Sequence, residues 1–270
     1  EQGLFVNGSR IAFDFAPAGA EDGALHGEPA DLVIFACKAP QLAAVLSDVK
    51  PYVGSGTLML SLLNGISSEQ EISGMYGAWR IPLAMILGTD AQHSGTHTTF
   101  SHKGVIHFGE ADGSESERVS RIAALFDKAG IAYEIPANML RRLWYKFMIN
   151  TGINQTSAAL QLTYRPFQTK GGISEARSMM EAAMREVIAI AQTEGINLND
   201  NDIASWYQTL DTLDPDTKTS MSQDVAAHRQ TEVELFAGTL IKMGKKKKIP
   251  VPVNQLLYWQ IRTLEQTYTQ

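Results

Sequence analysis

The hydrophobic pattern of this chain changes near residue 137, and this change constrains the fold more than any other feature. Before it, short apolar runs such as DLVIFACK (31–38) and TLMLSLLNG (57–65) alternate with segments of helical periodicity. Such runs are typical of strands buried on both faces of a sheet, and their alternation with helices indicates an open α/β sheet. We therefore expect an α/β domain over residues 1–136.

Beyond residue 137 only helical periodicity remains. The segments that carry it are 139–160, 173–194, 202–210, 223–243 and 254–268. No strand-like run of comparable quality lies between them, so the sequence predicts an all-helical domain over residues 137–270. Ligand sites concentrate where domains meet, and the first of these helices begins at the expected junction.

Turn and strand signals refine the first domain. Asn7-Gly8, between LFV and SRIAF, predicts a β-hairpin, and the Gly-, Ala- and Pro-rich residues 18–30 predict a connection. Further elements are expected as strands at 82–88 and 131–136, antiparallel strand material at 98–110, and helices at 40–49, 67–75 and 114–129.

Charge and cysteine content exclude several classes of protein. The 270 residues carry a net charge of −6, which gives no indication of binding to nucleic acid or to an anionic membrane. Cys37 is the only cysteine, so no intrachain disulfide can form and a reducing, cytoplasmic location is expected. No apolar run reaches the ~20 residues of a membrane span, and no signal peptide opens the chain. The first residue is Glu1 rather than Met, so we expect the natural start to lie upstream.

Lys146, Asn150 and Asn154 are the residues most suggestive of chemistry. Each lies four residues from the next, so on an α-helix they advance by ~40° per step and form a row of ~12 Å on one face. The neighbouring apolar residues predict that this face is at least half buried. A desolvated lysine beside amide donors can hold an anionic carbonyl compound and give a proton to its oxygen. The alternatives are a lysine whose stem covers apolar surface and two core amides with satisfied hydrogen bonds.

Two polar residues follow predicted buried strands. Lys38 ends the first and Asn64-Gly65 ends the second, and open α/β sheets bind ligands outside the carboxyl ends of their strands. Strand ends are also polar simply because they reach water. In the helical domain, Ser220 begins a capping box with Gln223, and Glu232 falls mid-helix, where a solvated glutamate is the default reading.

A group of histidines and a run of lysines give no indication of a functional site. His93, His97, His102 and His107 have spacings compatible with zinc, but their surroundings indicate strands and turns without a cysteine or carboxylate companion set, so no metal site is expected. Lysines 245–248 come at a predicted helix exit, where cations complement the helix dipole.

Taken together, these segments resemble the ketopantoate reductase (2-dehydropantoate 2-reductase) family over essentially the whole chain. The motifs that carry the resemblance are VIFACKAPQ (33–41), SLLNGISSEQ (61–70), LWYKFMINTGIN (143–154) and TSMSQDVAAHRQTEVELFAG (219–238). The resemblance implies a Rossmann-like NADP-binding domain over 1–136 and a substrate and dimerisation domain over 137–270, similar to the C-terminal domain of 6-phosphogluconate dehydrogenases. It also implies a soluble cytoplasmic enzyme, with a homodimer expected, that uses NADPH to reduce ketopantoate to pantoate on the route to pantothenate and coenzyme A.

The resemblance also assigns roles to individual residues. Lys146 becomes the proton donor to the ketone oxygen while a hydride passes to the ketone carbon, and burial is expected to lower its pKa toward the working range. The implied substrate contacts are Asn64, Lys146, Asn150, Asn154 and Ser220. The implied cofactor contacts are Lys38, Asn64, Ala91 and Glu232, and Glu232 would also fix the substrate hydroxyl.

The sequence departs from the family in two places. The G-x-G-x-x-G turn that binds the pyrophosphate is missing, and roughly the first thirty to forty residues of a dinucleotide unit have no counterpart. An omitted segment, a mis-started reading frame and a genuine loss of cofactor binding would each explain this, and we favour an omitted segment. Tyr164 stands near a position where many members offer another polar substrate contact. A related 2-oxo acid reductase, a hydroxyacid or opine-type dehydrogenase and a non-catalytic scaffold therefore stay open as alternatives.

Overall fold

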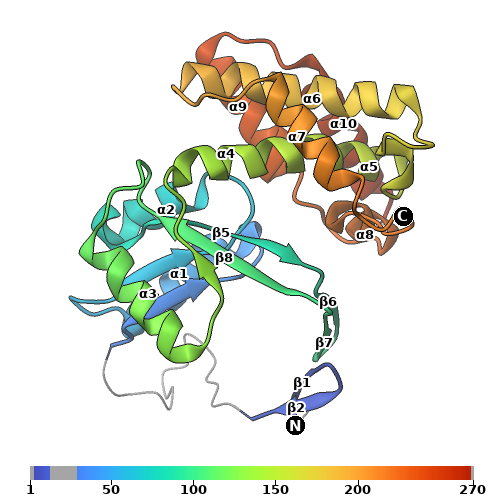
Figure 1. Cartoon of the computed structure of the whole chain (residues 1–270). Coiled ribbons are helices and arrows are strands. Elements are labelled where there is room, and N and C mark those ends of the chain that lie inside the picture. Colours follow the sequence, from blue (N-terminus) through green and yellow to red (C-terminus); the bar gives the residue numbers. More distant parts are fainter. Residues whose placement is uncertain (1–2, 13–28, 269–270) are drawn as a thin grey trace. The chain divides into compact units, whose positions relative to one another are not determined.

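The computed structural model describes residues 3–12 and 29–268 of the chain (Figure 1). The chain divides into two compact units. The α/β unit comprises Glu1–Leu63 and Ser68–Leu140, and the helical unit comprises Asn64–Ser67 and Arg141–Gln270. The predicted fold class, an α/β sheet region followed by an all-helical region, is confirmed.

The α/β unit contains short strands and three α-helices. Its strands are β1 (Leu4–Val6), β2 (Ser9–Ile11), β3 (Leu32–Phe35), β4 (Leu58–Ser61), β5 (Leu83–Thr89), β6 (Gln92–Ser94), β7 (His97–Thr99), β8 (Lys103–Gly109) and β9 (Tyr133–Glu134). Its helices are α1 (Leu42–Asp48), α2 (Ser68–Tyr76) and α3 (Glu117–Ala129), with 3₁₀ turns η1 (Ala39–Gln41), η2 (Lys50–Tyr52) and η3 (Ala78–Arg80).

The predicted hairpin at Asn7-Gly8 is confirmed. Asn7 and Gly8 have φ values of +48° and +79°, the left-handed pair that a two-residue hairpin turn requires. β1 pairs antiparallel with β2 and parallel with β7, and β7 pairs antiparallel with β6. The predicted connection over 18–30 falls mostly on residues 13–28, which lie outside the described part of the chain.

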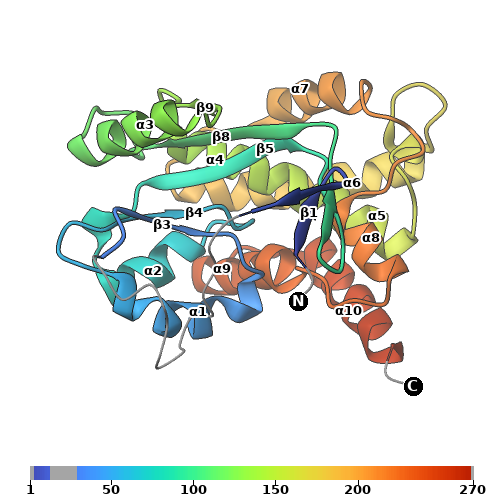
Figure 2. The same ribbon diagram turned by 90° about the horizontal axis from the view of Figure 1, so that it is seen from below.

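The centre of this unit is built on both faces of β4. β3 and β4 are parallel, with Val33 opposite Met59. Because side chains alternate along a strand, Leu58 and Leu60 pack toward the α3 cluster, whereas Met59 joins the cluster formed with α1 and α2. Figure 2 shows α3 on one side of the strands and α1 and α2 on the other. β5 lies in a separate sheet, antiparallel to β8, which in turn is parallel to β9.

The helical unit is built from seven described α-helices and two π-helical turns. They are α4 (Met139–Ile149), η4 (Asn150–Asn154), α5 (Gln155–Leu160), α6 (Ser174–Thr193), α7 (Asp200–Leu210), α8 (Ser220–Ala226), η6 (Glu234–Gly238), α9 (Thr239–Lys247) and α10 (Pro252–Thr267), with a 3₁₀ turn η5 (Arg165–Phe167). α4, η4 and α5 follow one another without a break. Within the described residues, no helix combines the length and apolar character needed to cross a bilayer.

The prediction of one helix over 223–243 is wrong. The chain instead forms α8, an irregular stretch, the π turn η6 and α9. α8 ends because His228 adopts a left-handed conformation (φ +51°), and the N–H of Arg229 turns back to the carbonyl of Asp224. The carboxylate of Glu265 then accepts hydrogen bonds from Thr231 N (2.8 Å) and Thr231 Oγ1 (2.7 Å). These bonds fix the backbone just before η6 begins at Glu234. Periodicity alone did not show this break because apolar residues continue across it at helical spacing.

Candidate functional site

The predicted row of Lys146, Asn150 and Asn154 lies on one continuous helical segment of the helical unit. Lys146 is in the last turn of α4, while Asn150 and Asn154 begin and end the π turn η4. Lys146 and Asn150 are half-buried, and Asn154 is 7% exposed. A π turn contains more than four residues, so two side chains four apart point in nearly the same direction. The wider turn therefore keeps both amides on one side of the helix.

The π turn itself was not predicted, and side chains explain why it forms. Gln155 Nε2 donates to the carbonyl of Thr151 (2.7 Å), and Thr156 Oγ1 donates to that of Gly152 (2.7 Å). These donors enter the backbone ladder where regular α-helical bonding is interrupted. Gly152 fits because a Cβ there would come within 2.5 Å of Met184 Cγ on α6. Single π turns inside α-helices occur frequently at functional sites.

The sequence predicted that Glu232 lies in the middle of a helix, and this prediction is wrong. Glu232 occupies the irregular stretch before the second π turn, and its carbonyl accepts from the N–H of Leu235 (2.9 Å). The two π turns are in contact, and the ring of Phe147 on α4 lies 6.3 Å from that of Phe236 in η6. The segment that follows Glu232 is thus packed against the one that carries the lysine and the two amides.

Asn64 and Glu232 are hydrogen-bonded, although 168 positions separate them. Asn64 Nδ2 donates to Glu232 Oε2 over 2.9 Å, and both groups are partly buried. The turn at Asn64-Gly65 reaches this point because Gly65 has φ +92° and lies against Leu235, 3.6 Å from where a Cβ would stand. Asn64 is the one hydrogen-bond partner of the Glu232 carboxylate within the part of the chain that the structure describes. A carboxylate can accept several hydrogen bonds, so Glu232 keeps capacity for a ligand hydroxyl.

Ser220 is not the N-cap of its helix. Thr219 caps α8 by accepting a hydrogen bond from Ser222 N (3.2 Å), and Ser220 is the exposed first residue of the helix. Thr219 Oγ1 also bonds to Ser157 Oγ (2.7 Å), which in turn donates to the carbonyl of Asn154 (3.2 Å). This chain of hydrogen bonds holds the start of α8 to the end of the π turn.

The other two predicted contacts belong to the α/β unit. Lys38 follows β3 and is exposed, and its backbone N–H donates to Gln41 Oε1 (3.2 Å). Ala91 is exposed between β5 and β6, and its N–H donates to Thr89 Oγ1 (3.4 Å). The group that the structure brings together therefore consists of residues of the helical unit, including Asn64.

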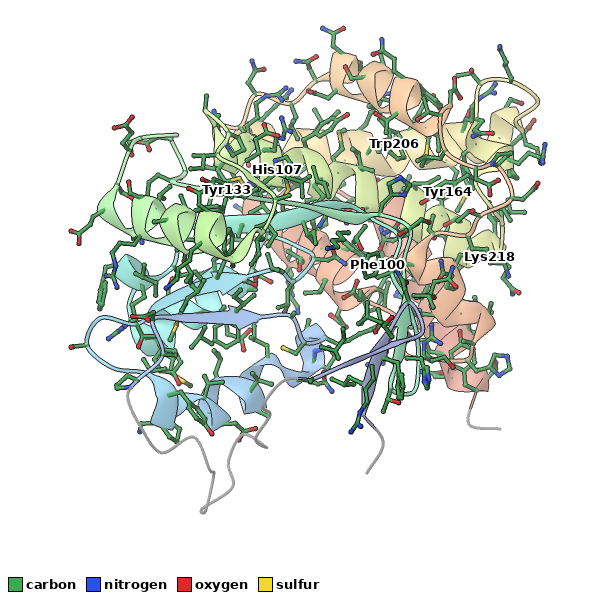
Figure 3. The ribbon with its side chains drawn as sticks, turned by 60° about the horizontal axis from the view of Figure 1, so that its bottom comes forward. Phe100, His107, Tyr133, Tyr164, Trp206 and Lys218 are labelled. Carbon is green, nitrogen blue, oxygen red and sulfur yellow. The ribbon has the colours of Figure 1, made fainter. Side chains whose placement is uncertain are left out.

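Tyr164 lies beside the chain that leads into α8. Its N–H donates to the carbonyl of Thr217 (3.0 Å), the residue before Lys218. Tyr164 and Lys218 are both labelled in Figure 3. Burial raises the pKa of the Tyr164 phenol, so this group is a neutral hydroxyl near pH 7.

The histidines have separate environments. His107 on β8 is buried, with Nδ1 3.3 Å from Glu134 Oε2 on β9, the strand that also carries Tyr133 (Figure 3). His97 stacks on Phe5 at 4.6 Å, and His102 Nδ1 lies 3.5 Å from Asp90 Oδ2. Among the described residues, no group of three or more His, Cys, Asp or Glu side chains could hold a metal ion.

Sequence reasoning missed the buried polar run that organises this region. Gln155, Thr156 and Ser157 are fully buried, and with Asn154 they form four consecutive polar residues inside a core helix. That run was a usable signal, because buried polar groups need internal partners. Their partners come from three other helical segments and could not be assigned from the sequence.

The two-unit plan, with parallel strands followed by a helical unit that carries a lysine and amide row, defines the class of dinucleotide-dependent reductases with a helical second domain. Sequence profiles specify the family. The profile described as "Ketopantoate reductase PanE/ApbA" matches residues 1–113, and "Ketopantoate reductase PanE/ApbA C terminal" matches residues 138–265. The chain belongs to the ketopantoate reductase family, whose members are NADP-dependent oxidoreductases.

Individual relatives agree with this assignment. A 2-dehydropantoate 2-reductase of Streptococcus pyogenes serotype M3 is 27% identical over 85% of this chain and 74% of its own length. A PanE/ApbA family ketopantoate reductase from Ralstonia eutropha JMP134 has a TM-score of 0.78 at 25% identity, over 90% of this chain and 78% of its own.

Two more distant structures share the fold. A D-mandelate dehydrogenase solved with NADH has a TM-score of 0.86 at 22% identity, over 99% of this chain and 86% of its own. A dimeric ketopantoate reductase from Staphylococcus aureus has a TM-score of 0.77 at 20% identity, over 88% of this chain and 78% of its own.

The corrected cap of α8 leads to a stability prediction. Thr219→Ala removes the cap and one of the two hydrogen bonds of the Ser157 hydroxyl, so we expect a loss of about 1–2 kcal/mol. Ser220→Ala changes only an exposed hydroxyl and should cost no more than about 0.5 kcal/mol. Urea unfolding followed by circular dichroism would measure both. Equal losses for the two variants would contradict the assignment of Thr219 as the cap.

Proposed function

We propose that this protein reduces a 2-oxo acid with NADPH, and that ketopantoate, reduced to pantoate for pantothenate and coenzyme A synthesis in the cytoplasm, is its substrate. The observation that carries the proposal is the hydrogen bond between Asn64 and Glu232. The family resemblance assigns both residues to the site, and they meet in the same helical unit that holds Lys146, Asn150 and Asn154. Membership of the family and the relatives named 2-dehydropantoate 2-reductase support the same reaction.

Lys146 is the proton donor in this proposal. As the ketone carbon is reduced, negative charge grows on its oxygen, and the ammonium stabilises that charge and transfers a proton to it. Half-burial of Lys146 strengthens the interaction, because the local dielectric is lower than that of water.

Neutral donors bind the rest of the substrate. Asn150 and Asn154 face the same side of the π turn and can donate to the carboxylate, and Ser220 offers an exposed hydroxyl at the start of α8. Amides hold an anion without adding a second charge whose desolvation would need to be offset. Glu232 accepts from the substrate hydroxyl, and its hydrogen bond from Asn64 sets the direction of its carboxylate.

The nicotinamide supplies the hydride when bound. The residues that fit it are Lys38 and Asn64, which follow the carboxyl ends of the parallel strands β3 and β4, where α/β sheets bind ligands. Ala91 and Glu232 are the further contacts that the family resemblance assigns. No residue of this chain is assigned to the pyrophosphate, because the sequence holds no G-x-G-x-x-G turn.

Removal of the proton donor tests the mechanism. Lys146→Ala should lower kcat with ketopantoate and NADPH by about 10²–10⁴-fold, because both the proton and the stabilising charge are lost. Lys170→Ala, which removes an exposed lysine of the same unit, should leave turnover unchanged. NADPH oxidation followed by its loss of near-ultraviolet absorbance, with folding checked by circular dichroism, provides the measurement. Full activity in Lys146→Ala would exclude Lys146 as the donor.

A different 2-oxo acid is the second candidate, and Tyr164 is the observation that favours it. A neutral phenol beside the segment leading into α8 would suit a larger or aromatic substrate. The NADH complex of D-mandelate dehydrogenase shows that this fold also accommodates an aryl hydroxy acid dehydrogenase.

One series of binding and activity measurements can identify both the preferred cofactor and the preferred substrate. Quenching of NADPH and NADH fluorescence should show binding, with NADPH preferred, and a panel of 2-oxo acids should give its highest kcat/KM with ketopantoate. An aromatic 2-oxo acid as the best substrate would replace ketopantoate and keep the reaction class. Failure of the natural protein to bind either nucleotide would favour the scaffold instead.

We further propose that the helical unit pairs with a second copy of the chain. Leu256 and Trp259, one turn apart on α10, are 49% and 60% exposed. Exposed tryptophans of this kind often anchor interfaces. The dimeric relative from Staphylococcus aureus supports this choice of partner.

A charge on this face tests the dimer. Trp259→Glu should convert a dimer into a monomer, because an unpaired carboxylate would be buried at the interface. Leu125→Glu, a comparable change at a position 38% exposed on α3, should leave the dimer intact. Light scattering coupled to size exclusion gives the masses. Dimers in both variants would exclude this face of α10, and a monomeric parent protein would exclude pairing altogether.

A further inference from the structure

Gln155 is a buried side chain with three hydrogen bonds that directly follows a candidate substrate contact, and no step of the proposed reaction uses it. It is 0% exposed and directly follows Asn154. Its Nε2 donates to the carbonyl of Thr151 (2.7 Å) and to Asn254 Oδ1 (2.9 Å), and its Oε1 accepts from Ala237 N (2.9 Å). One amide therefore connects the first π turn, the second π turn and α10.

The orientation of the Gln155 amide is fixed by the carboxylate of Glu186, to which it is connected through Asn254. Glu186 accepts hydrogen bonds from Val253 N, from Asn254 N and from Asn254 Nδ2 (2.7 Å). Because a carboxylate only accepts, the NH₂ group of Asn254 must face it and the Oδ1 of Asn254 must face Gln155. Gln155 must then present its own NH₂ to Asn254, which leaves its oxygen for Ala237.

Ala237 matters because of where it lies. It is the fourth residue of η6, the π turn that begins two residues after Glu232. The other side of Gln155 is bonded to Thr151, within the turn that runs from Asn150 to Asn154. The hydrogen bonds of Gln155 thus join the π turn that follows Glu232 to the π turn that carries the two candidate substrate amides.

We propose that Gln155 is a positioning residue, which holds Glu232 and its partner Asn64 in register with Asn150 and Asn154. The inference rests on the proposed reductase function for its kinetic consequence, but not for its structural one. Loss of the amide leaves Ala237 N, Thr151 O and Asn254 Oδ1 without their partner in a buried environment. The segments around them must then shift to regain hydrogen bonds.

Gln155→Leu is the test, with Gln168→Leu as its matched control. Gln168 is also buried (8% exposed), and its Nε2 donates to the carbonyls of Leu210 (3.0 Å) and Leu213 (2.8 Å), away from both π turns. Both variants should lower the midpoint of unfolding. Only Gln155→Leu should lower kcat, by about 10²-fold, with a smaller change in KM, since small displacements of reacting groups have effects of this size.

The side-chain amide signal of Asn64 provides a readout independent of activity. In a ¹⁵N spectrum of the labelled protein, assigned with Asn64→Ala, this signal should shift or broaden in Gln155→Leu and stay unchanged in Gln168→Leu. An unchanged Asn64 signal and an unchanged kcat in folded Gln155→Leu would overturn the positioning role. If the parent protein has no reductase activity, the proposed function fails, while the spectrum still decides the role of Gln155.

Gln155→Glu adds a pH-dependent test. At high pH its carboxylate would face the oxygens of Thr151 and Asn254 and repel both, whereas protonation restores one donor. The Asn64 signal should therefore move toward the parent position as the pH falls through the pKa of the introduced acid. A Gln155→Glu signal that stays displaced at every pH at which the protein is folded would contradict the need for a donor at this position.

Discussion

The helical unit depends on the burial of four consecutive polar side chains, Asn154 to Ser157. Burying such groups is unfavourable unless each finds a partner, so their hydrogen bonds restrict how the surrounding helices can pack. Gln155 is hydrogen-bonded to η6 and to α10, and Ser157 is hydrogen-bonded to Thr219 at the start of α8. These bonds fix where the three segments lie against the helix. Apolar residues alone would tolerate several packings at this helix, whereas the polar run is satisfied by one.

The first π turn, η4, is stabilised by the same polar side chains. A carbonyl oxygen can accept two hydrogen bonds, and here the side chains of Gln155 and Thr156 donate to the carbonyls of Thr151 and Gly152, although Gly152 O also accepts the backbone N–H of Gln155. The turn widens, and Gly152 lets it lie close to α6. The local cost of irregular bonding is offset by tertiary contacts, a combination that occurs where a helix presents functional groups.

The sequence predicted the parts of the protein that depend on short-range patterns. The Asn7-Gly8 hairpin, the change from α/β to helical structure and the helical row from Lys146 to Asn154 each follow from spacing within a few residues. The break before Glu232 did not, because it is set by Glu265, which is 33 positions away from that residue. The meeting of Asn64 with Glu232 was likewise beyond spacing arguments, since hydrogen bonds between distant segments leave no periodicity in the sequence.

The carboxylates of the helical unit also explain why Glu232 is suited to a ligand. Glu186 and Glu265 each accept backbone N–H groups at a segment start, so their charges stabilise the fold. Glu232 receives a single hydrogen bond, from the neutral amide of Asn64, and no cation is paired with it among the residues that the structure describes. A half-buried carboxylate with unused acceptor capacity is costly for stability alone. A hydroxyl donated by a bound substrate would reduce that cost, which would couple substrate binding to the satisfaction of the Glu232 carboxylate.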